Sequence, residues 1–284
     1  MNALHRLTVT WLLGVNVMAA ATCAQAGQPC DTRPAQSNDV VRGMTLAAST
    51  AARLDATGAQ VVVLARAGQD LSKYGVSWSH FGFAYREGDG PRSHWRVVHK
   101  LNHCGTANAA LYRQGLGEFF LDQPHRYEAA FVELTPEVQS KLLPLLRDNT
   151  RIDDWHEPRY SMVAYPWAIR YQQSNQWALE TLAGAMDTGA TTRQRAQAWL
   201  QLRGYEPTTL RIDPLTRLGG RMTRANIEFD DHPNAKRFTD RIAPGAPPPE
   251  VADDGREFAC IPALGRRDCR QQRAQRHLVV ALDR

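Results

Sequence analysis

The fold of this chain is decided by one stretch, residues 61–85, which reads VVVLARAGQDLSKYGVSWSHFGFAY. Its β-branched apolar start predicts a buried strand over Gln60–Arg66, and its end predicts a second strand over Ser77–Arg86. Successive side chains of a strand point to opposite faces. One face of the second strand therefore carries three aromatic rings, and the other carries a histidine beside two small residues: Phe81, Phe83 and Tyr85 against His80, Gly82 and Ala84. We expect a neighbouring element to fit closely against the small-residue face.

Helices and strands on both sides of this pair complete an α+β pattern. Apolar residues at three- and four-residue spacing predict helices at Asn38–Ala56, Ser174–Met186 and Thr191–Arg203, and another that starts at Thr135-Pro136 and that Pro144 should end or kink. Further strands are predicted at His94–Leu101, Tyr127–Leu134, Leu210–Ile212, Asn226–Phe229 and His277–Leu282, and an irregular helix at Asn108–Phe119. We expect a small antiparallel sheet from the strands near Val61, His80, His99 and Phe131, packed against the Ser174 helix.

The first 26 residues are typical of a cleavable secretory signal peptide. The basic residues His5 and Arg6 precede an apolar block, and Ala24-Gln25-Ala26 gives the small-x-small pattern that signal peptidase cuts. The sequence therefore predicts a protein that is periplasmic or otherwise exported, with a mature chain that begins near Gly27.

The rest of the chain divides into one domain and a tail. Residues 27–243 are predicted to form an α+β domain with a C-terminal elaboration from about residue 204. Residues 244–284 begin with a Pro-rich linker and continue as a basic tail. No later stretch approaches the ~18 apolar residues that a span needs, so we expect no transmembrane segment in the mature chain. The net charge of +5 is dispersed among acidic residues, which favours a basic surface facing anionic envelope polymers or lipids over nucleic-acid binding.

Four cysteines remain once Cys23 is removed, an even number in a compartment that favours disulfides. Cys260 and Cys269 would close a short loop in the tail, and Cys30 and Cys104 would then pair with each other. Four cysteines permit three pairings, so this one is a preference among them.

Short motifs in the domain resemble those of a known group of proteins. Ala65-Arg66-Ala67-Gly68 and Ser79-His80-Phe81-Gly82-Phe83 look like the opening segment of circularly permuted NlpC-type papain-like proteins, where a Ser-His-hydrophobic-Gly strand supplies the histidine before the cysteine-bearing helix. Longer motifs resemble an uncharacterised bacterial domain-of-unknown-function family (number twenty-one forty-five) within or near that group: HKLNHCG at 99–105, GLGEFF at 115–120 and SNQW at 174–177. The resemblance covers roughly residues 60–186 and implies a papain-like α+β fold.

The residues themselves also indicate a site for acyl transfer, with a histidine on one strand, a second polar residue on the adjoining strand and a nucleophile at the start of a buried helix. His80 would be the general base, as the resemblance implies. His99, which alternation places on the face of Trp95 and Val97, would orient it, and the nucleophile would stand at the start of the helix that begins at Ser174. The resembled pattern has a cysteine where this chain has Ser174. A serine attacks only if a base takes its proton during the attack, so His80 would have to act as that base. In a cysteine enzyme the histidine need only stabilise a thiolate that is already formed. We expect no metal and no cofactor.

Structural roles compete with these catalytic ones. Ser174 is a good N-cap for its helix whatever its function, and His80 also fits a hydrogen-bonded core histidine. His103-Cys104 is a rival nucleophile pair, although adjacent residues on a strand point to opposite faces. A metal site from His80, His99 and His103 is conceivable, but the four-residue spacing of the last two suits a helix rather than a strand.

Two functions from different classes follow. The first is an exported papain-like hydrolase or acyltransferase that acts on an amide or ester of the cell envelope, with His80, His99 and Ser174 as catalytic residues. The second is a catalytically inactive papain-like module that binds an envelope peptide, glycan or lipid in the same groove, with His80 and Trp177 as recognition residues. The sequence leaves the oligomeric state open.

Overall fold

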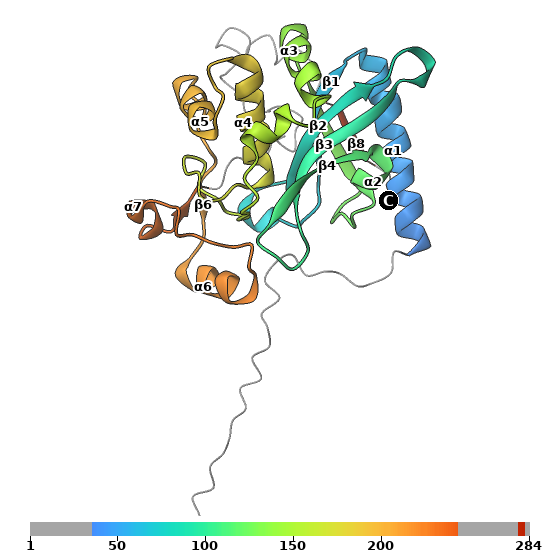
Figure 1. Cartoon of the computed structure of the whole chain (residues 1–284). Coiled ribbons are helices and arrows are strands. Elements are labelled where there is room, and N and C mark those ends of the chain that lie inside the picture. Colours follow the sequence, from blue (N-terminus) through green and yellow to red (C-terminus); the bar gives the residue numbers. More distant parts are fainter. Residues whose placement is uncertain (1–35, 244–277, 282–284) are drawn as a thin grey trace, which may run out of the picture.

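An antiparallel sheet forms the middle layer of the molecule (Figure 1). The computed structural model describes residues 36–243 and 278–281. The sheet has the strand order β4-β3-β2-β1-β5-β8, with bounds Ala109–Gly115, His94–Asn102, His80–Glu87, Val61–Arg66, Glu128–Glu133 and Leu278–Ala281. Every neighbouring pair is antiparallel. The predicted antiparallel sheet is thus confirmed, with β4 and β8 added to the strands that the sequence placed in it.

The centre of the sheet is β1, the strand that the apolar run predicted. It pairs with β2 from Val61–Tyr85 to Arg66–His80, and with β5 along its other edge. All six of its residues are buried. A strand that is covered on both faces can be apolar at every position, whereas a half-exposed strand alternates. This burial explains why the run from Val61 to Ala65 has no polar residue.

One face of the sheet is covered by α1 (Ser37–Thr57) and α2 (Leu116–Phe120). The predicted helix at Asn38–Ala56 is therefore confirmed, and it ends at Gly58, whose φ of 71° is the left-handed conformation that favours glycine. The core of this layer joins helix and strand side chains, among them Leu46, Leu54, Phe119 and Phe120 with Val62, Leu64, Ala84, Val97, Ala129 and Phe131.

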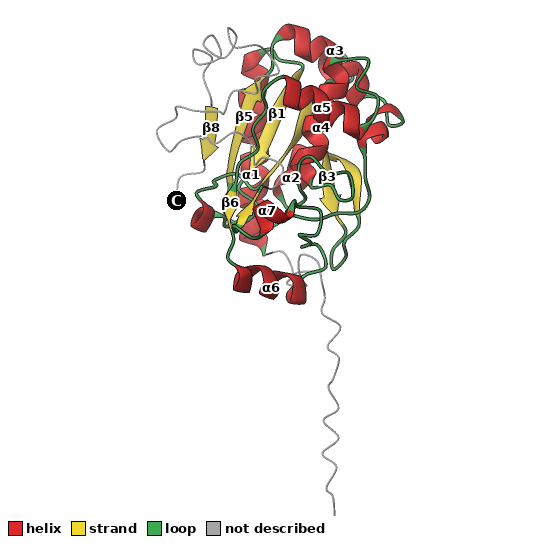
Figure 2. Cartoon of the chain, turned by 90° about the vertical axis from the view of Figure 1, so that its left-hand side faces the viewer, coloured by secondary structure: helices red, strands yellow, loops and turns green. Residues whose placement is uncertain are grey.

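The opposite face packs against α3 (Pro136–Leu146), α4 (Ser174–Met186) and α5 (Arg193–Leu202), so the sheet lies between two helical layers (Figure 1). Figure 2 views the molecule from the side of α4 and α5. Along each strand, the side chains of this second core alternate with those of the first. They include Val61, Val63, Phe81, Phe83, Tyr85 and Val98. The hydroxyl of Thr135 caps α3 as expected, and α3 ends two residues after Pro144. All three helices were predicted from their apolar spacing.

Two expectations about secondary structure are wrong, and two helices were not predicted. Residues 109–115 form β4 instead of part of an irregular helix, because pairing with β3 overrides the helical propensity of Ala-Ala-Leu. Asn226–Phe229 is not a strand. The sequence analysis did not predict α6 (Pro214–Thr223) and α7 (Asn234–Arg237), which lie near a short ladder of β6 (Leu210–Arg211) and β7 (Arg241–Ile242).

Several predictions fall outside the part of the chain that the structure describes. These are the signal peptide at residues 1–26, the Pro-rich linker, and the positions of Cys30, Cys260 and Cys269. Cys104 is disulfide-bonded, and its pairing with Cys30 stays a prediction. No helix among the described residues has the length and apolar character that crossing a bilayer requires.

Candidate functional site

Two of the predicted site residues meet on neighbouring strands. Nε2 of His80 at the start of β2 is 2.8 Å from Nδ1 of His99 on β3, and Nε2 of His99 is 2.8 Å from Oε1 of Gln114 on β4. An amide oxygen can only accept, so His99 carries its proton on Nε2 and accepts at Nδ1 the hydrogen bond that His80 donates. Nδ1 of His80 is then an acceptor.

The surroundings of this histidine pair keep both rings neutral. Burial lowers the pKa of His99 to about 3 and that of His80 well below its usual value, and the nearby Arg66 guanidinium lowers both further. Phe119 of α2 covers the pair, with its ring centroid 6.0 Å from that of His80 and 5.2 Å from that of His99. A general base works best with a pKa near the ambient pH, so this environment makes His80 a weak base.

Ser174, the predicted nucleophile, belongs to the helix on the opposite face of the sheet. The histidine pair lies on the face that α2 covers, and α4 packs against the other one. Burial raises the pKa of the Tyr160 hydroxyl, and the Ser174 hydroxyl beside it offsets part of that rise. Within the described ranges, no hydrogen bond joins Ser174 to His80 or His99. The structure thus brings two of the three predicted catalytic residues together and leaves the third apart.

The start of α4 nevertheless lies against the start of β2. The β2–β3 ladder ends at the pair of Phe83 and Val98, and beyond it the backbone N–H of Phe81 donates to Oδ1 of Asn175 at 3.4 Å. Ser174 precedes Asn175, and His80 precedes Phe81, so each is one residue from this contact.

Two structural interpretations of α4 need correction. Its N-cap is Gln173, and Ser174 is already helical, so Ser174 does not cap the helix. Trp177 has no exposed surface, which makes it a core anchor and excludes it as a recognition residue.

Gly82 makes room for the histidine pair and not for α4. A Cβ atom at Gly82 would lie 2.6 Å from the carbonyl oxygen of Val98 and 2.7 Å from Cβ of His99, both closer than real contacts allow. The missing side chain lets β3 bring His99 against β2. The element that fits against the small-residue face is therefore not α4, because α4 covers the aromatic face.

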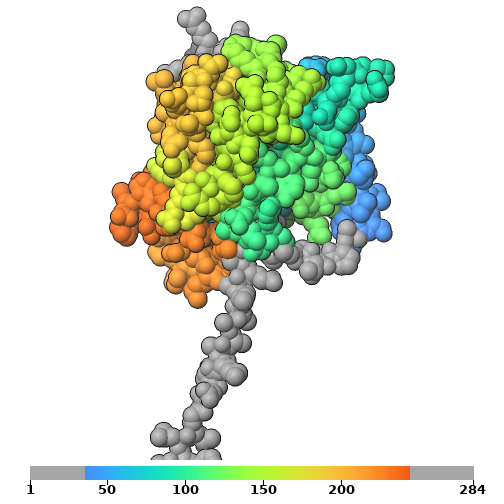
Figure 3. All heavy atoms as spheres, in the orientation of Figure 1, coloured from blue at the N-terminus to red at the C-terminus, as the bar shows by residue number. Residues whose placement is uncertain are grey.

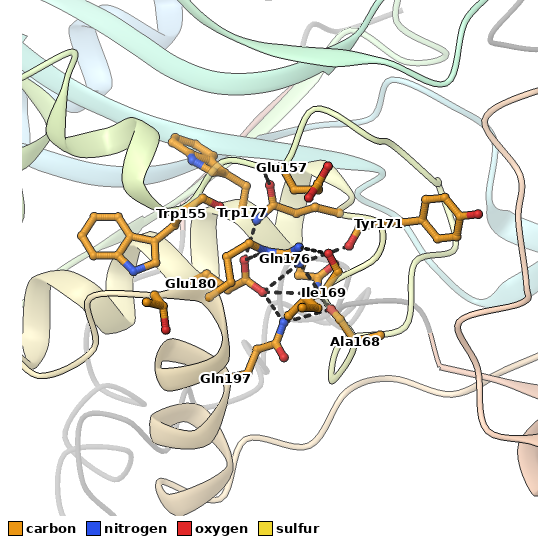
Figure 4. A network of polar contacts seen from close by, with 12 residues as sticks. Trp155, Glu157, Ala168, Ile169, Tyr171, Gln176, Trp177, Glu180 and Gln197 are labelled. Carbon is orange, nitrogen blue, oxygen red and sulfur yellow. Dashed lines mark hydrogen bonds and ion pairs between the residues drawn. The ribbon is translucent and has the colours of Figure 1, made fainter.

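A buried polar network under α4 centres on Glu180 (Figure 4). Its carboxylate accepts from Nε of Arg193 at 2.8 Å and from the side-chain amides of Gln176 at 3.2 Å and Gln197 at 2.6 Å. Arg193 also donates to backbone carbonyls of the 168–171 segment. This network ties α4, α5 and the segment before α4 together.

Lys100 on β3 extends the polar interior toward the sheet. Its ammonium donates to Oε1 of Gln172 at 2.7 Å and to the carbonyl of Glu157 at 2.6 Å. Burial lowers the pKa of Lys100 well below its usual value. Gln172 in turn donates to Glu180, so the lysine is linked to the network through one amide. Sequence reasoning missed this cluster, although a glutamate inside the apolar α4 helix was a signal for it.

A pocket of about 290 Å³ lies between the loop that precedes β2 and the segment that ends in β6. Its described lining contains no acidic residue and offers two cations, two aromatic rings and three serine or threonine hydroxyls: Lys73 and Arg211, Tyr74 and Trp78, Ser77, Thr208 and Thr209. Nε1 of Trp78 is buried and has no hydrogen-bond partner among the described residues. The two walls are more than a hundred residues apart in sequence, so no local motif marks them.

The metal interpretation of the histidines finds no support. In the residues that the structure describes, no group of three His, Cys, Asp or Glu side chains could hold a metal ion. The His103 ring instead packs edge-on against Tyr112, with centroids 6.4 Å apart.

Comparison with known proteins gives one match. The model of a family described as an uncharacterized protein conserved in bacteria matches residues 53–245. No curated protein and no solved structure matches the chain.

Proposed function

Since the chain belongs to the family DUF2145, whose description assigns no activity, we propose from the site geometry that it is an exported module that binds an acidic envelope ligand. The pocket between the β2 loop and β6 carries this proposal. We take the fold to be papain-like, as the Ser79–Phe83 motif suggests. In this proposal the histidine pair has a structural role and no catalytic one.

The pocket chemistry favours an acidic sugar over a neutral one or a cation. Lys73 and Arg211 supply positive charge on opposite walls, and a guanidinium pairs well with a carboxylate. The Tyr74 ring offers an apolar surface, and the hydroxyls of Ser77, Thr208 and Thr209 offer polar partners. Pockets usually combine an apolar lining with a few polar groups that fix orientation. The volume suits a single sugar unit rather than a long polymer.

Binding of two sugars that differ by one carboxylate tests the proposal. We expect N-acetylmuramic acid to bind to the protein, and N-acetylglucosamine, which lacks the lactyl carboxylate, to bind about tenfold more weakly or not at all. Titration calorimetry or ligand-observed NMR would measure both.

Matched arginine variants locate the site. Arg211→Ala should weaken binding of the acidic sugar about tenfold and leave that of the neutral sugar unchanged, because it removes one charge-assisted contact. Arg53→Ala, which removes an exposed arginine on α1, is the control and should change neither. Equal binding of the two sugars, or equal loss in both variants, would refute the pocket as the ligand site.

A second candidate function is acyl transfer, favoured by the contact between Asn175 and Phe81 and by the acceptor at Nδ1 of His80. It requires the Ser174 hydroxyl to leave Tyr160 and reach that nitrogen. The hydrolase or acyltransferase would then act on an envelope amide or ester with His80 as base, His99 as orienter and Ser174 as nucleophile.

Ser174→Cys separates the two candidates. If the chain is a binding module, the new thiol should react with iodoacetamide no faster than a free cysteine, and adding His80→Ala should not slow it, because no imidazole contacts it. The parent protein gives the background from native cysteines. A rapid reaction that depends on His80 would indicate a thiolate with a lowered pKa and would replace the binding proposal with acyl transfer.

A further inference from the structure

The helix α6 presents an apolar stripe that no other described residue covers. Leu215, Leu218 and Met222 are 78%, 56% and 66% exposed. Their spacing of three and four residues places them on one side of the helix. Large apolar side chains that gather on an exposed helix face are typical of an interaction surface.

The opposite side of α6 is fixed to the protein, so the stripe has a defined direction. Asp213 caps the helix through the backbone N–H of Thr216 at 2.9 Å. Arg217 donates to the Asp240 carboxylate at 2.7 Å and to the carbonyl of Arg237, which ties α6 to the turn after α7. A Cβ atom added at Gly220 would lie 3.3 Å from Cγ2 of Ile227, so this side of α6 faces the Ile227 side chain. The apolar side chains are therefore held outward.

Positive charge accompanies the stripe. Residues 214–227 contain three arginines and no acidic residue. Arg221 lies beside the stripe, is 50% exposed and makes one long ion pair, 3.4 Å, with Glu228. Phe238, which is 82% exposed, follows Arg237 on the turn that Arg217 holds. An amphipathic helix with arginines beside its apolar face has the character of an interfacial membrane helix.

We propose that α6 docks this protein on an anionic lipid surface, with Leu215, Leu218 and Met222 among the acyl chains and Arg221 and Arg224 at the headgroups. A second copy of the chain fits less well, because a two-fold contact would set the same cationic face against itself. Both cartoon views place α6 at one end of the molecule, away from the sheet, and the orange segment protrudes at that end in Figure 3. Such a position leaves the helix free to reach a flat surface. This proposal goes beyond the ligand pocket and does not depend on it.

Vesicle flotation with the full chain tests the docking. We expect the protein to float with vesicles of phosphatidylglycerol and phosphatidylcholine, and to float poorly with phosphatidylcholine alone. The triple variant Leu215→Ser, Leu218→Ser and Met222→Ser should partition about tenfold less, because it removes the apolar insertion. Arg221→Gln with Arg224→Gln should lower binding and its sensitivity to salt.

The matched control is Leu202→Ser, which removes a leucine that is 84% exposed on α5. It should float like the parent. Docking on lipid would be refuted if the parent did not float, or if the control lost as much binding as the triple variant. A parent that fails to float but forms dimers that the triple variant abolishes would assign the stripe to a second copy. Loss of thermal stability in the triple variant without any flotation would assign it to another segment of the same chain.

Discussion

Replacing Glu180 by alanine is expected to destabilise the protein by about 3–5 kcal/mol, the range for removing one partner of a buried ion pair. Glu180 has no exposed side-chain surface, and the Arg193 side chain is only 8% exposed. Without the carboxylate, the guanidinium would stay buried with backbone carbonyls as its only partners among the described residues, and the side-chain amides of Gln172, Gln176 and Gln197 would lose an acceptor. Urea unfolding followed by circular dichroism measures the change in the free energy of unfolding.

Further variants separate the charge from the hydrogen bonds. Glu180→Gln keeps an acceptor of similar shape and should cost less than the alanine variant. The double variant Glu180→Leu with Arg193→Met removes both charges and should recover much of the loss, because no unpaired charge remains. Gln194→Ala, at an exposed position of the same helix as Arg193, is the control. A loss below about 1 kcal/mol in Glu180→Ala would mean that the pair is solvated, and the network would then not hold α5 in place.

The sheet could be predicted because its signals are local. Residues 61–85 contain the apolar run of β1 and the alternation of β2, and both patterns follow from the geometry of a single strand. The helices α1, α3 and α4 have regular apolar spacing as well. The strand β4 was missed because its small residues favour a helix in isolation, and only the partner β3 makes them a strand.

The site was only half predictable for a different reason. Alternation shows that His80 and Phe81 face opposite ways, but it does not say which face receives which helix. Both faces of β2 are buried, so α4 could have covered either one, and it covers the face of Phe81. The pairing of His80 with His99 followed from adjacent strands and was expected. The pocket walls at Trp78 and Arg211 are joined only by the tertiary fold, so no spacing in the sequence reveals them.

The helix α6 was not predicted, because apolar spacing is a weak signal in a helix this short. Asp213 and Pro214 are a good N-cap and first-turn residue, and Leu215, Leu218 and Met222 have helical spacing. Gly219 and Gly220 interrupt this pattern with the residue that destabilises helices most after proline. The packing of Gly220 against Ile227 compensates, and that contact is visible only in the folded chain.

Acidification should destabilise the protein as the pH falls below about 6.5, and the buried His99 should account for much of the effect. Its pKa falls from 6.5, the ordinary value, to about 3 in the folded protein, because burial disfavours the charged ring and Arg66 repels it. The unfolded chain therefore binds a proton between these two values and the folded protein does not. Above pH 6.5 the His99 ring is neutral in both states and costs no stability. Between pH 6.5 and pH 3 the loss of unfolding free energy grows as the pH falls, and it is about 3 kcal/mol at pH 4.

The variant His99→Gln isolates this contribution, because its amide has no proton to gain and can still accept from His80. We expect the difference in unfolding free energy between pH 7.5 and pH 4 to shrink by about 3 kcal/mol relative to the parent. His94→Gln, which removes an exposed histidine from the same strand, should leave that difference unchanged. The pKa of Lys100 is also lowered by burial, and its titration cancels in the comparison. His99 itself lowers part of the His80 pKa, so the variant relieves that part too and the expected decrease includes it. Parallel pH profiles for the parent and His99→Gln would show that His99 is not neutral in the folded state, and the assignment of His80 as donor to Nδ1 would fail with it.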